Sequence, residues 1–427
     1  MKKVVRLVAR ILLPPGLRLR VNILSSYFRR KTILSKIRGK LAHGGKIKVI
    51  FLSSENSKWK CQSLYDLMKS SQWYEPIIGI MKQDADVDGT SEEIECGIDK
   101  AERFFSKHGC RTTRVYNVDN GKYCDLRAFS PGIVIYQQPW NIEGAVWPAQ
   151  AAKFALPCYV PYFLPNYIFP GIAYKQDFHR LIAHYFVLNK AECALGESVR
   201  GFFDFAGDLR AVGHPMLDDF FLNPVGKHEQ QCVIYAPHFS FSHPNNYSFV
   251  HYSTFLDTGE CILRYAKQHP EMNWVFKPHP RLKIALKSSG AWTGDRIAGY
   301  YAAWGNIGQV CDSDDYIPLF RKATAMITDC GSFLTEFAAT GQPIIRLVNP
   351  ENKQPYPPLY DTYYNVHNND ELEATLREVL EKGIDRKRDE RLEAVEAANL
   401  TGQYAAKNIM DFFAKEFGIC SDLCHRQ

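Results

Sequence analysis

The segment CVIYAP, residues 232–237, is a short apolar run with β-branched and aromatic side chains, and it ends at a proline. Three similar runs follow it along the chain, at NWVFK (273–277), AMIT (325–328) and PIIRL (343–347). Helical patterns separate these runs, at Ser253–Gln268, Tyr316–Ala323, Gly331–Thr340 and Glu371–Lys382. Continuous apolar runs that alternate with helices predict parallel strands covered by helices on both faces.

The preceding part of the chain shows the same alternation from Lys46 onward. Strand-like runs occupy 46–53, 76–80, 132–137, 185–189 and 209–213, and helical patterns occupy Lys58–Ser70, Ser91–His108 and the residues after Lys190. A chain of 427 residues exceeds the size at which a single core stops growing. We therefore expect an α/β protein with two Rossmann-like domains that face each other across a cleft.

The boundary between the two series is a polar segment, Asn223–Gln231, which contains Pro224 and Gly226. Such a segment is typical of a linker. We expect one domain at residues 46–222 and the other at residues 223–427.

Residues 1–45 form a separate segment by charge. Residues 1–48 contain fourteen Lys and Arg and no Asp or Glu, whereas the rest of the chain has 38 basic and 46 acidic residues. In MKKVVRLVARILL (1–13), Lys3, Arg6 and Arg10 form one stripe before Pro14 and Pro15. A second helical stretch, Val21–Leu41, places an apolar set roughly on one side: Leu24, Phe28, Leu34, Ile37 and Leu41.

This arm is too interrupted to cross a bilayer, which needs ~18–20 apolar residues, and Arg6 and Arg10 exclude a secretory signal. We expect a basic amphipathic helix that binds an anionic membrane surface through residues 1–41, at the cytoplasmic face. A helix packed on the protein body is an alternative. A nucleic-acid arm is another, but only Tyr27 and Phe28 could stack on bases, and we expect no nucleic-acid partner.

The cysteines indicate neither disulfides nor a metal. All twelve are scattered, without a CxxC pair, and the group Cys420, Cys424 and His425 lacks a fourth ligand. We expect reduced thiols and no metal site.

Polar residues follow three of the predicted strands in the C-terminal half. In parallel sheets, ligands bind beyond the carboxyl ends of the strands, so these residues are the candidate site. His238 follows the first strand, and Lys277, His279 and Arg281 follow the second. The third strand is followed by Asp329, Gly331, Ser332 and Glu336, which lead into a helix.

Cations and a helix N-terminus are suited to binding phosphates. Taken singly, each piece has a simpler interpretation, because Lys277-Pro278-His279-Pro280 makes a rigid turn and Asp329 or Ser332 can cap a helix. Asp329, which is acidic, could instead orient a histidine. The combination at three strand ends favours a diphosphate site.

The C-terminal half, from about Gly213 to Lys382, resembles the CDP-glycerol glycerophosphotransferases of teichoic acid and capsule synthesis. The segment Gly213–Asp218 is similar to that family's Gly-x-Pro-Arg-x-Asp, and Tyr235-Ala236-Pro237 is similar to its Tyr-Ala-Pro-Thr. Lys277–Pro280 matches Lys-x-His-Pro, and Ile327–Ser332 aligns with Ile-Thr-Asp-Tyr-Ser-Ser. Pro343-Ile344 matches the Pro-Ile that follows the helix.

The resemblance implies a GT-B fold and a CDP diphosphate held by His279 and the residues around Ser332. It implies transfer of an alditol phosphate from a CDP-activated donor to a membrane-attached glycan or polyol-phosphate acceptor. The sequence departs from the family at Met216, which replaces an Arg, and at Tyr136–Asn141, which lacks the family's His. We therefore take His238 as the catalytic base, with His243 as second choice.

The donor-binding set that we predict is Lys277, Arg281, Asp329, Gly331, Ser332 and Glu336, and the catalytic pair is His238 and His279. Gln138 and Trp140 are candidates for an acceptor cleft, with a buried aromatic core as the alternative. We expect no cofactor, and a divalent-metal requirement stays open. Two other functions are a GT-B glycosyltransferase that uses a nucleotide sugar, with Glu336 or Asp329 on the sugar, and a non-catalytic membrane-bound adaptor.

Overall fold

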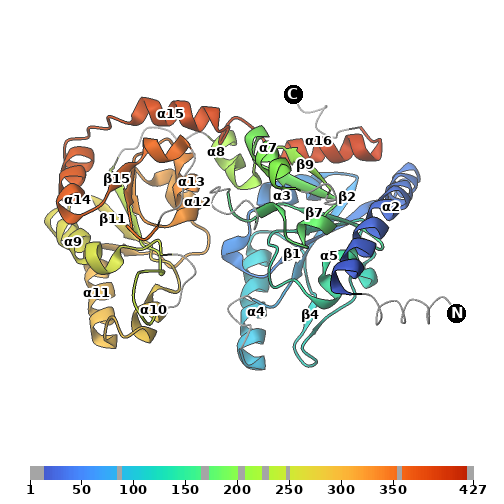
Figure 1. Ribbon diagram of the computed structural model, residues 1–427, viewed down its shortest axis with the longest axis horizontal. Helices are drawn as coiled ribbons and strands as arrows, with labels where there is room; N and C mark the ends of the chain where they lie inside the picture. Colours follow the sequence, from blue (N-terminus) through green and yellow to red (C-terminus); the bar gives the residue numbers. More distant parts are fainter. Residues whose placement is uncertain are drawn as a thin grey trace. The chain divides into compact units, whose positions relative to one another are not determined.

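The chain forms two compact units, each built on a parallel sheet (Figure 1). Unit 1 comprises Met1–Phe163, Phe169–Asp218 and Gln403–Gln427, and unit 2 comprises Leu164–Ile168 and Asp219–Gly402. The structure, a computed structural model, describes residues 14–83, 89–164, 173–200, 207–223, 230–246, 251–352 and 358–420. Residues 1–13 and most of the predicted linker lie outside these ranges.

Unit 1 has a seven-stranded sheet with the order β3-β2-β1-β6-β7-β8-β9, in which all neighbouring strands are parallel. The strands are β1 (Ile47–Ser53), β2 (Tyr74–Ile80), β3 (Thr112–Arg114), β6 (Ile133–Tyr136), β7 (Leu156–Tyr159), β8 (His184–Val187) and β9 (Asp208–Ala211). Two of them, β3 and β7, were not predicted. Strand β3 has only three polar residues, and β7 contains Pro157.

Both faces of this sheet are buried. In β1, Val49 and Phe51 belong to one core cluster, whereas Ile50 and Leu52 belong to another. The first cluster also contains residues of α3 (Gln62–Ser70), α4 (Ser91–Lys107) and α16 (Ala405–Phe417), and the second contains residues of α5 (Pro148–Ala151). Residues of α7 (Lys190–Val199) pack against the second cluster. A small antiparallel ribbon joins β4 (Tyr116–Asn117) and β5 (Lys122–Tyr123). Two covered faces explain why the strands are continuous apolar runs.

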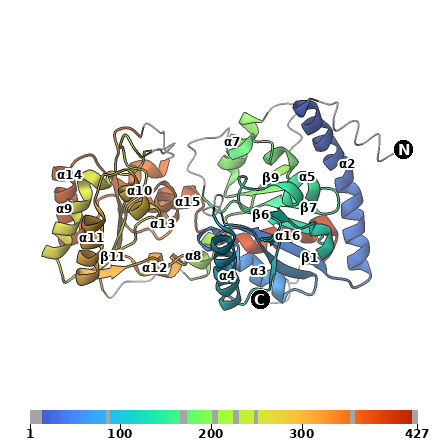
Figure 2. The same ribbon diagram turned by 90° about the horizontal axis from the view of Figure 1, so that it is seen from below.

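Helix α2 (Pro15–Ala42) is part of unit 1 and not a separate arm. Its buried side chains are Ile23, Ile33, Ile37 and Leu41. The guanidinium of Arg30 donates to the carbonyl of Ala183 at 3.3 Å and pairs with Glu416 of α16 at 3.4 Å. Figure 2 shows α2 along the outer side of this unit.

The predicted apolar side of α2 is only partly right. Ile37 and Leu41 are buried and Leu34 is half-buried, but Leu24 and Phe28 are 42% and 70% exposed. The helix has apolar residues on two opposite faces, so a single predicted face mixed residues from both.

The last helix, α16, also packs on unit 1, although we expected residues 223–427 to form one domain. Its apolar side chains Ile409, Phe413 and Phe417 are buried in the first core cluster of unit 1. At its start, the buried carboxylate of Asp218 accepts hydrogen bonds from the backbone N–H groups of Ala405 at 2.6 Å and Ala406 at 3.0 Å. It also accepts from the Ser63 hydroxyl at 2.7 Å. Nearby, Gly213 has φ +88°, and an added Cβ would lie 3.0 Å from Ala405 Cβ. This junction requires glycine for both reasons.

Unit 2 has a six-stranded parallel sheet with the order β12-β11-β10-β13-β14-β15. Its strands are β10 (Cys232–Ala236), β11 (Asn273–Phe276), β12 (Gly308–Val310), β13 (Ala325–Thr328), β14 (Ile344–Leu347) and β15 (Tyr364–Val366). The four predicted strands are confirmed as β10, β11, β13 and β14. The short strands β12 and β15 carry half-buried residues and gave no apolar run.

The predicted helices of unit 2 correspond to α9 (Phe255–Gln268), α12 (Ile317–Lys322), α13 (Gly331–Ala338) and α14 (Asn369–Leu376). Among the described residues, four further helices were not predicted: α8 (Asp218–Leu222), at the start of the unit, α10 (Leu282–Ser288), α11 (Gly294–Ile307) and α15 (Arg388–Ala397). Both units therefore have the predicted α/β architecture. Among the described residues, none of the helices combines the length and the apolar character needed to cross a bilayer.

We predict that Asp218→Ala lowers the free energy of unfolding by about 2–3 kcal/mol, because two buried backbone N–H groups lose a charged acceptor. Asp219→Ala is the matched control. Its carboxylate is 41% exposed and pairs with Arg321, so we expect a change below about 1 kcal/mol. Denaturant unfolding measures both, and equal effects would contradict the role given to Asp218.

Candidate functional site

The candidate site lies in unit 2, at the carboxyl ends of β10, β11 and β13. Because β10 is the central strand of these three, the segments that follow them are neighbours. The backbone N–H of His279 donates to the Pro237 carbonyl at 2.9 Å, which joins the segments after β10 and β11. The backbone N–H of His238 donates to Asp329 Oδ1 at 2.6 Å, which joins the segments after β10 and β13. The predicted proximity of these strand ends is therefore present.

His238 and His279 lie side by side, with ring centroids 4.8 Å apart and planes inclined at 64°. Each ring accepts a hydrogen bond at Nδ1 from a backbone N–H two residues further on. Ser240 N–H donates to His238 Nδ1 at 3.2 Å, and Arg281 N–H donates to His279 Nδ1 at 3.1 Å. Since a backbone N–H can only donate, Nδ1 is the acceptor and a neutral ring carries its proton at Nε2.

Both histidines are held neutral. Burial, together with the nearby Arg281 and Lys277 charges, lowers the pKa of His279 to about 4. Burial, with His279 and Arg281 nearby, holds the pKa of His238 well below its usual range. The pair therefore presents two neutral Nε2–H donors near pH 7. Such a donor can bind a phosphate oxygen but cannot accept a proton at that atom.

The two cations of this segment differ in their surroundings. Arg281 is exposed, and its guanidinium lies 4.6 Å from the centre of the Phe239 ring, which itself packs on both histidines at 4.5 Å. Lys277 is buried, and its ammonium donates to the Ser313 carbonyl at 2.8 Å and lies 5.4 Å from the centre of the Tyr316 ring. Burial lowers the pKa of Lys277. Arg281 thus packs in the histidine cluster through the Phe239 ring. The buried Lys277 affects His279 through its charge.

Asp329 is 3% exposed and is hydrogen-bonded to the segments that form the site. Its Oδ2 accepts from Thr254 N–H and from the Ser253 hydroxyl, each at 3.0 Å, while Oδ1 accepts from His238 N–H. We predicted donor binding, or orientation of a histidine, for this residue. These contacts make it a positioning residue for the His238 segment.

The N-terminus of α13 is connected to the histidines through Tyr252. The Tyr252 ring packs against His238 at 5.3 Å, and an added Cβ at Gly331 would lie 3.4 Å from the same ring. Ser332, in the first turn, is half-buried, and its hydroxyl contacts Cys330 Sγ at 3.6 Å. Further along α13, Glu336 is 2% exposed and accepts from the Tyr316 hydroxyl. Glu336 thus holds the aromatic ring that contacts Lys277.

Sequence reasoning missed the aromatic side chains that assemble this site, namely Phe239, Tyr252 and Tyr316. Phe239 and Tyr316 stand next to predicted strand or helix ends, and that position was the available signal. The second-choice base, His243, has its Nδ1 occupied in the same way, by Asn245 N–H at 3.2 Å. A neutral His243 ring therefore also carries its proton at Nε2, as in His238 and His279.

The candidate acceptor residues lie at the carboxyl ends of strands in unit 1. Gln138, after β6, is buried, accepts from the Ser54 hydroxyl at 3.0 Å and donates to the Trp140 carbonyl at 2.9 Å. Trp140 is half-buried and packs with Tyr162 and Phe163, at 5.7 and 6.3 Å between ring centroids. Gln138 therefore fixes the loop that follows β6. The half-buried rings of Trp140, Tyr162 and Phe163 form an aromatic group at this loop.

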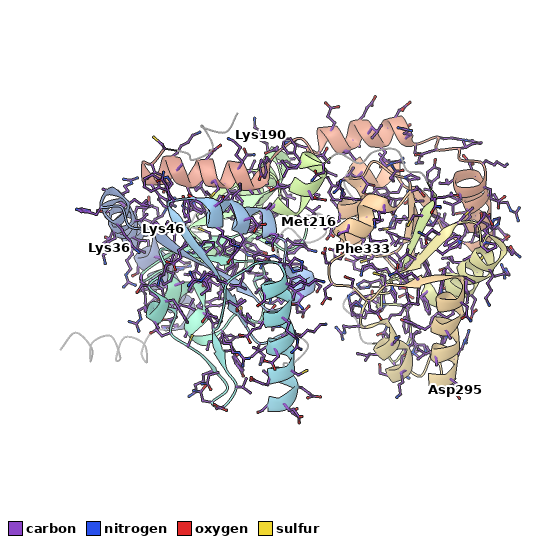
Figure 3. All side chains as sticks on the ribbon, turned by 180° about the vertical axis from the view of Figure 1, so that it is seen from behind. Lys36, Lys46, Lys190, Met216, Asp295 and Phe333 are labelled. Carbon is purple, nitrogen blue, oxygen red and sulfur yellow. The ribbon has the colours of Figure 1, made fainter. Side chains whose placement is uncertain are left out.

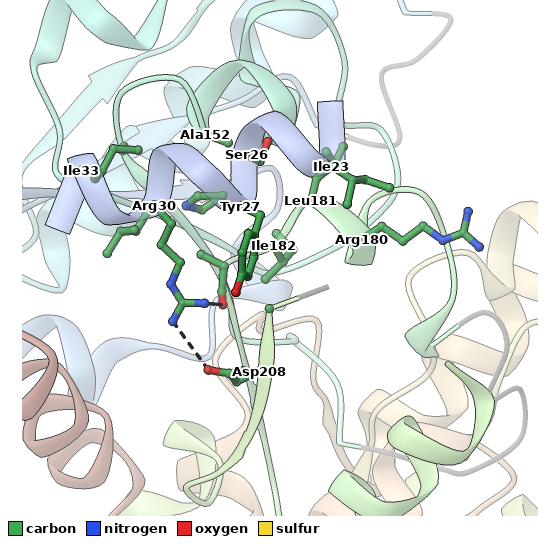
Figure 4. A pocket seen from close by; sticks show the side chains of 15 residues that line it. Ile23, Ser26, Tyr27, Arg30, Ile33, Ala152, Arg180, Leu181, Ile182 and Asp208 are labelled. Atoms are coloured by element: carbon green, nitrogen blue, oxygen red, sulfur yellow. Dashed lines mark hydrogen bonds and ion pairs between the residues drawn. The ribbon is translucent and has the colours of Figure 1, made fainter. Parts of the chain in front are cut away.

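A pocket in unit 1 lies at the opposite, amino ends of the strands, between α2 and the residues that precede β7, β8 and β9 (Figure 4). Its lining is mainly apolar, including Ile23, Ile33 and Leu181. The ion pair of Arg30 with Asp208, at 3.6 Å, lies at one side. Because ligands of parallel sheets bind at the carboxyl ends, we do not assign this pocket to the candidate site.

Within the described residues, no group of three or more His, Cys, Asp and Glu side chains is placed to hold a metal ion, and no disulfide links the cysteines.

No protein-family model matches the chain, and no curated protein matches it. Solved structures do match. The Staphylococcus aureus MnaA–UDP structure has a TM-score of 0.55 at 12% identity, covering 88% of this chain and 98% of the other. A Neisseria meningitidis UDP-GlcNAc 2-epimerase bound to UDP-GlcNAc has a TM-score of 0.53 at 12% identity, covering 87% and 100%.

The wall teichoic acid polymerase TagF also matches, with a TM-score of 0.53 at 12% identity and coverage of 87% and 89%. These similarities determine the fold. It is GT-B.

We predict that Asp329→Asn changes how stability depends on pH. Burial raises the pKa of Asp329 to about 7 against its hydrogen bonds, from an ordinary value of 3.8. Between these values the folded state binds more protons than the unfolded state, so stability falls as pH rises through this window and then levels off. The wild type should lose stability relative to Asp329→Asn, by on the order of 1 kcal/mol per pH unit.

Denaturant unfolding at several pH values from 4.5 to 7.5 measures this difference. The exposed Asp219→Asn is the matched control and should follow the wild-type curve. Parallel curves for the wild type and Asp329→Asn would show that Asp329 does not have the raised pKa described above.

Proposed function

We propose that this chain is a transferase whose unit 2 binds the diphosphate of a nucleotide-activated donor. The single observation that carries the proposal is the pair of neutral histidines, His238 and His279, each with Nδ1 occupied and Nε2–H available for a phosphate oxygen. Arg281 supplies the positive charge beside them, and Ser332 and the N-terminus of α13 add further donors. Such an arrangement of donors is suited to two adjacent phosphates.

Named ligands of the structural neighbours support a donor of this kind. MnaA was solved with UDP, the Neisseria epimerase with UDP-GlcNAc, and TagF after a soak with CDPG. Together with the sequence motifs that resemble the CDP-glycerol glycerophosphotransferases, the TagF match favours a CDP-activated alditol as donor. We therefore propose alditol-phosphate transfer in the synthesis of a teichoic acid or capsule polymer.

In the proposed reaction, a hydroxyl oxygen of the acceptor attacks the distal phosphorus of a CDP-alditol. The new bond joins this oxygen to phosphorus, and the bond between phosphorus and the bridging oxygen breaks. CMP leaves with that electron pair, and the hydroxyl proton passes to solvent or to a base. Charge on the phosphoryl oxygens and on the leaving CMP is what the protein must stabilise.

The geometry favours a different role for His238 than the base that we predicted. With Nδ1 occupied and the proton on Nε2, His238 is set up to donate to the transferred phosphoryl group or to CMP. Phosphoryl transfer depends mainly on positioning and charge stabilisation. Two fixed neutral donors beside Arg281 supply both kinds of help. Lys277 and Asp329 act as positioning residues, through Tyr316 and through the His238 backbone.

A second candidate function is glycosyl transfer from a nucleotide sugar, in which the acceptor attacks an anomeric carbon and a nucleoside diphosphate leaves. It is supported by the two neighbours solved with UDP or UDP-GlcNAc. The phosphate contacts would be the same. Glu336, which is buried against Tyr316, would reach a sugar only after a rearrangement.

We propose that the acceptor is a membrane-attached glycan or polyol phosphate and that the protein works peripherally at the cytoplasmic face. The aromatic group of Trp140, Tyr162 and Phe163 is the proposed acceptor surface in unit 1. Aromatic faces of this kind pack against sugar or polyol carbons while leaving their hydroxyls solvated.

We predict that His279→Ala slows donor turnover by about 10- to 100-fold, a loss of about 1.4–2.7 kcal/mol in transition-state stabilisation. The tautomer adds a sharper expectation. His279→Gln can present an amide N–H near the position of Nε2, whereas His279→Asn places its amide near Nδ1. We therefore expect His279→Gln to retain more activity than His279→Asn or His279→Ala.

Nucleotide release from the donor measures these rates. His269→Ala is the matched control, because His269 is a partly exposed histidine of the same unit, paired with Glu271 and Glu381 on the surface. It should stay within about threefold of wild type. A His279→Ala variant that also stays within threefold would refute the donor site.

We predict that the purified protein releases CMP from CDP-glycerol or CDP-ribitol and little UDP from UDP-sugars, because the strand-end motifs favour a CDP-alditol. Release of UDP instead would assign the glycosyltransferase function. Titration calorimetry with CDP and UDP tests the third possible function, a non-catalytic adaptor. Neither release nor binding at millimolar nucleotide would indicate a non-catalytic adaptor.

A further inference from the structure

Helix α2 carries a second apolar face, on the side away from the core. Four of its residues are large, apolar and exposed: Leu17 (44%), Val21 (49%), Leu24 (42%) and Phe28 (70%). Their spacing of four, three and four residues aligns them on one side of a helix, over about 16 Å. We call these four residues the outer stripe.

The outer stripe is distinct from the face that holds α2 on unit 1. The buried residues Ile23, Ile33, Ile37 and Leu41 lie roughly opposite to it around the helix. Among the described residues, no outer-stripe side chain belongs to a core cluster of unit 1. Four neighbouring large apolar side chains on a solvent-facing helix indicate a binding surface.

Basic residues stand on both sides of the outer stripe. By helical position, Arg20 and Lys31 lie on one flank and Arg29 and Lys36 on the other, and all except the half-buried Arg29 are exposed. Figure 3 shows Lys36 at the outer side of unit 1. Residues 1–48 contain no Asp or Glu, so no acidic side chain of this segment neutralises these charges.

We infer that the outer stripe of α2 inserts into a bilayer that contains anionic lipids, with the helix lying flat in the headgroup region. Leu and Phe side chains enter the acyl boundary, and the flanking Lys and Arg reach lipid phosphates on both sides. The pattern matches this occupant because apolar and cationic contacts are needed together. A second copy of the same face would bring two basic flanks together, which disfavours a dimer.

This inference names a specific surface and does not depend on the transfer reaction. It also differs from the arm that the sequence predicted, since Ile37 and Leu41 belong to the core and only Leu24 and Phe28 of that predicted set face outward. Residues 1–13 lie outside the described residues and form no part of the proposed surface.

Vesicle flotation of the full-length protein tests the inference, with phosphatidylcholine vesicles that contain either none or about one third phosphatidylglycerol. We expect the wild type to bind the anionic vesicles and added salt to weaken that binding. The double variant Leu24→Gln/Phe28→Gln should partition at least tenfold more weakly. Arg20→Gln/Lys31→Gln should weaken binding to anionic vesicles only.

The matched control is Ile384→Gln/Leu392→Gln, which removes two similarly exposed apolar side chains of unit 2, at 41% and 43% exposure. It should bind within about twofold of wild type. Circular dichroism checks that every variant remains folded. Because all the substituted side chains are exposed, we expect unchanged spectra.

Two results would overturn the inference. One is wild-type protein that fails to bind anionic vesicles, or a stripe variant that binds as well as wild type. The other is a dimer in solution that disappears in Leu24→Gln/Phe28→Gln while vesicle binding is absent, which would assign the outer stripe to a second copy. Neither assay uses a nucleotide, so failure here leaves the proposed transfer to be judged by its own experiments.

Discussion

The candidate site depends on one buried carboxylate. Asp329 follows β13, yet it binds the backbone N–H of His238 after β10 and the backbone N–H of Thr254 at the start of α9. In a parallel sheet the segments beyond the strand ends have no ladder partners of their own, and a shared acceptor fixes them to one another. Burial makes this acceptor costly to ionise and hence sensitive to what surrounds it. The histidine cluster is held in place because the Asp329 carboxyl group accepts hydrogen bonds from three donors: His238 N–H, Thr254 N–H and the Ser253 hydroxyl.

The histidines follow from this arrangement. Once the segments after β10 and β11 are fixed, the amide groups of Ser240 and Arg281 reach the Nδ1 atoms of the two rings, and the proton positions are determined by the backbone. Neutral donors bind phosphate less strongly than imidazolium ions would, but they keep the same charge across the physiological range. An enzyme that must release a nucleotide after each transfer benefits from a site that is specific without being strongly cationic.

The sequence predicted the sheets well and the side-chain roles less well, for a physical reason. Buried parallel strands such as β10 and β13 appear as continuous apolar runs, and the residues just beyond them can be located from the chain alone. Their partners cannot. We predicted that Lys277 binds a phosphate, but in the structure its ammonium donates to the Ser313 carbonyl. We also predicted Glu336 in the donor site, but its carboxylate is buried and accepts a hydrogen bond from the Tyr316 hydroxyl. The start of α16 is hydrogen-bonded to Asp218, nearly two hundred residues earlier. Such contacts leave no local periodicity.

The two faces of α2 illustrate the same limit and connect it to the charge of the chain. A helix with apolar residues on opposite sides has no single amphipathic pattern, so sequence inspection merged Leu24 with Leu41. Only the packed structure separates the residues that attach the helix from those that remain outside. Beyond residue 48 the chain is acidic, with 46 acidic against 38 basic residues, and an anionic surface repels it. The basic helix reverses that sign locally. In the proposed docking, the field of the protein therefore favours the orientation in which the basic helix α2 faces the negatively charged membrane.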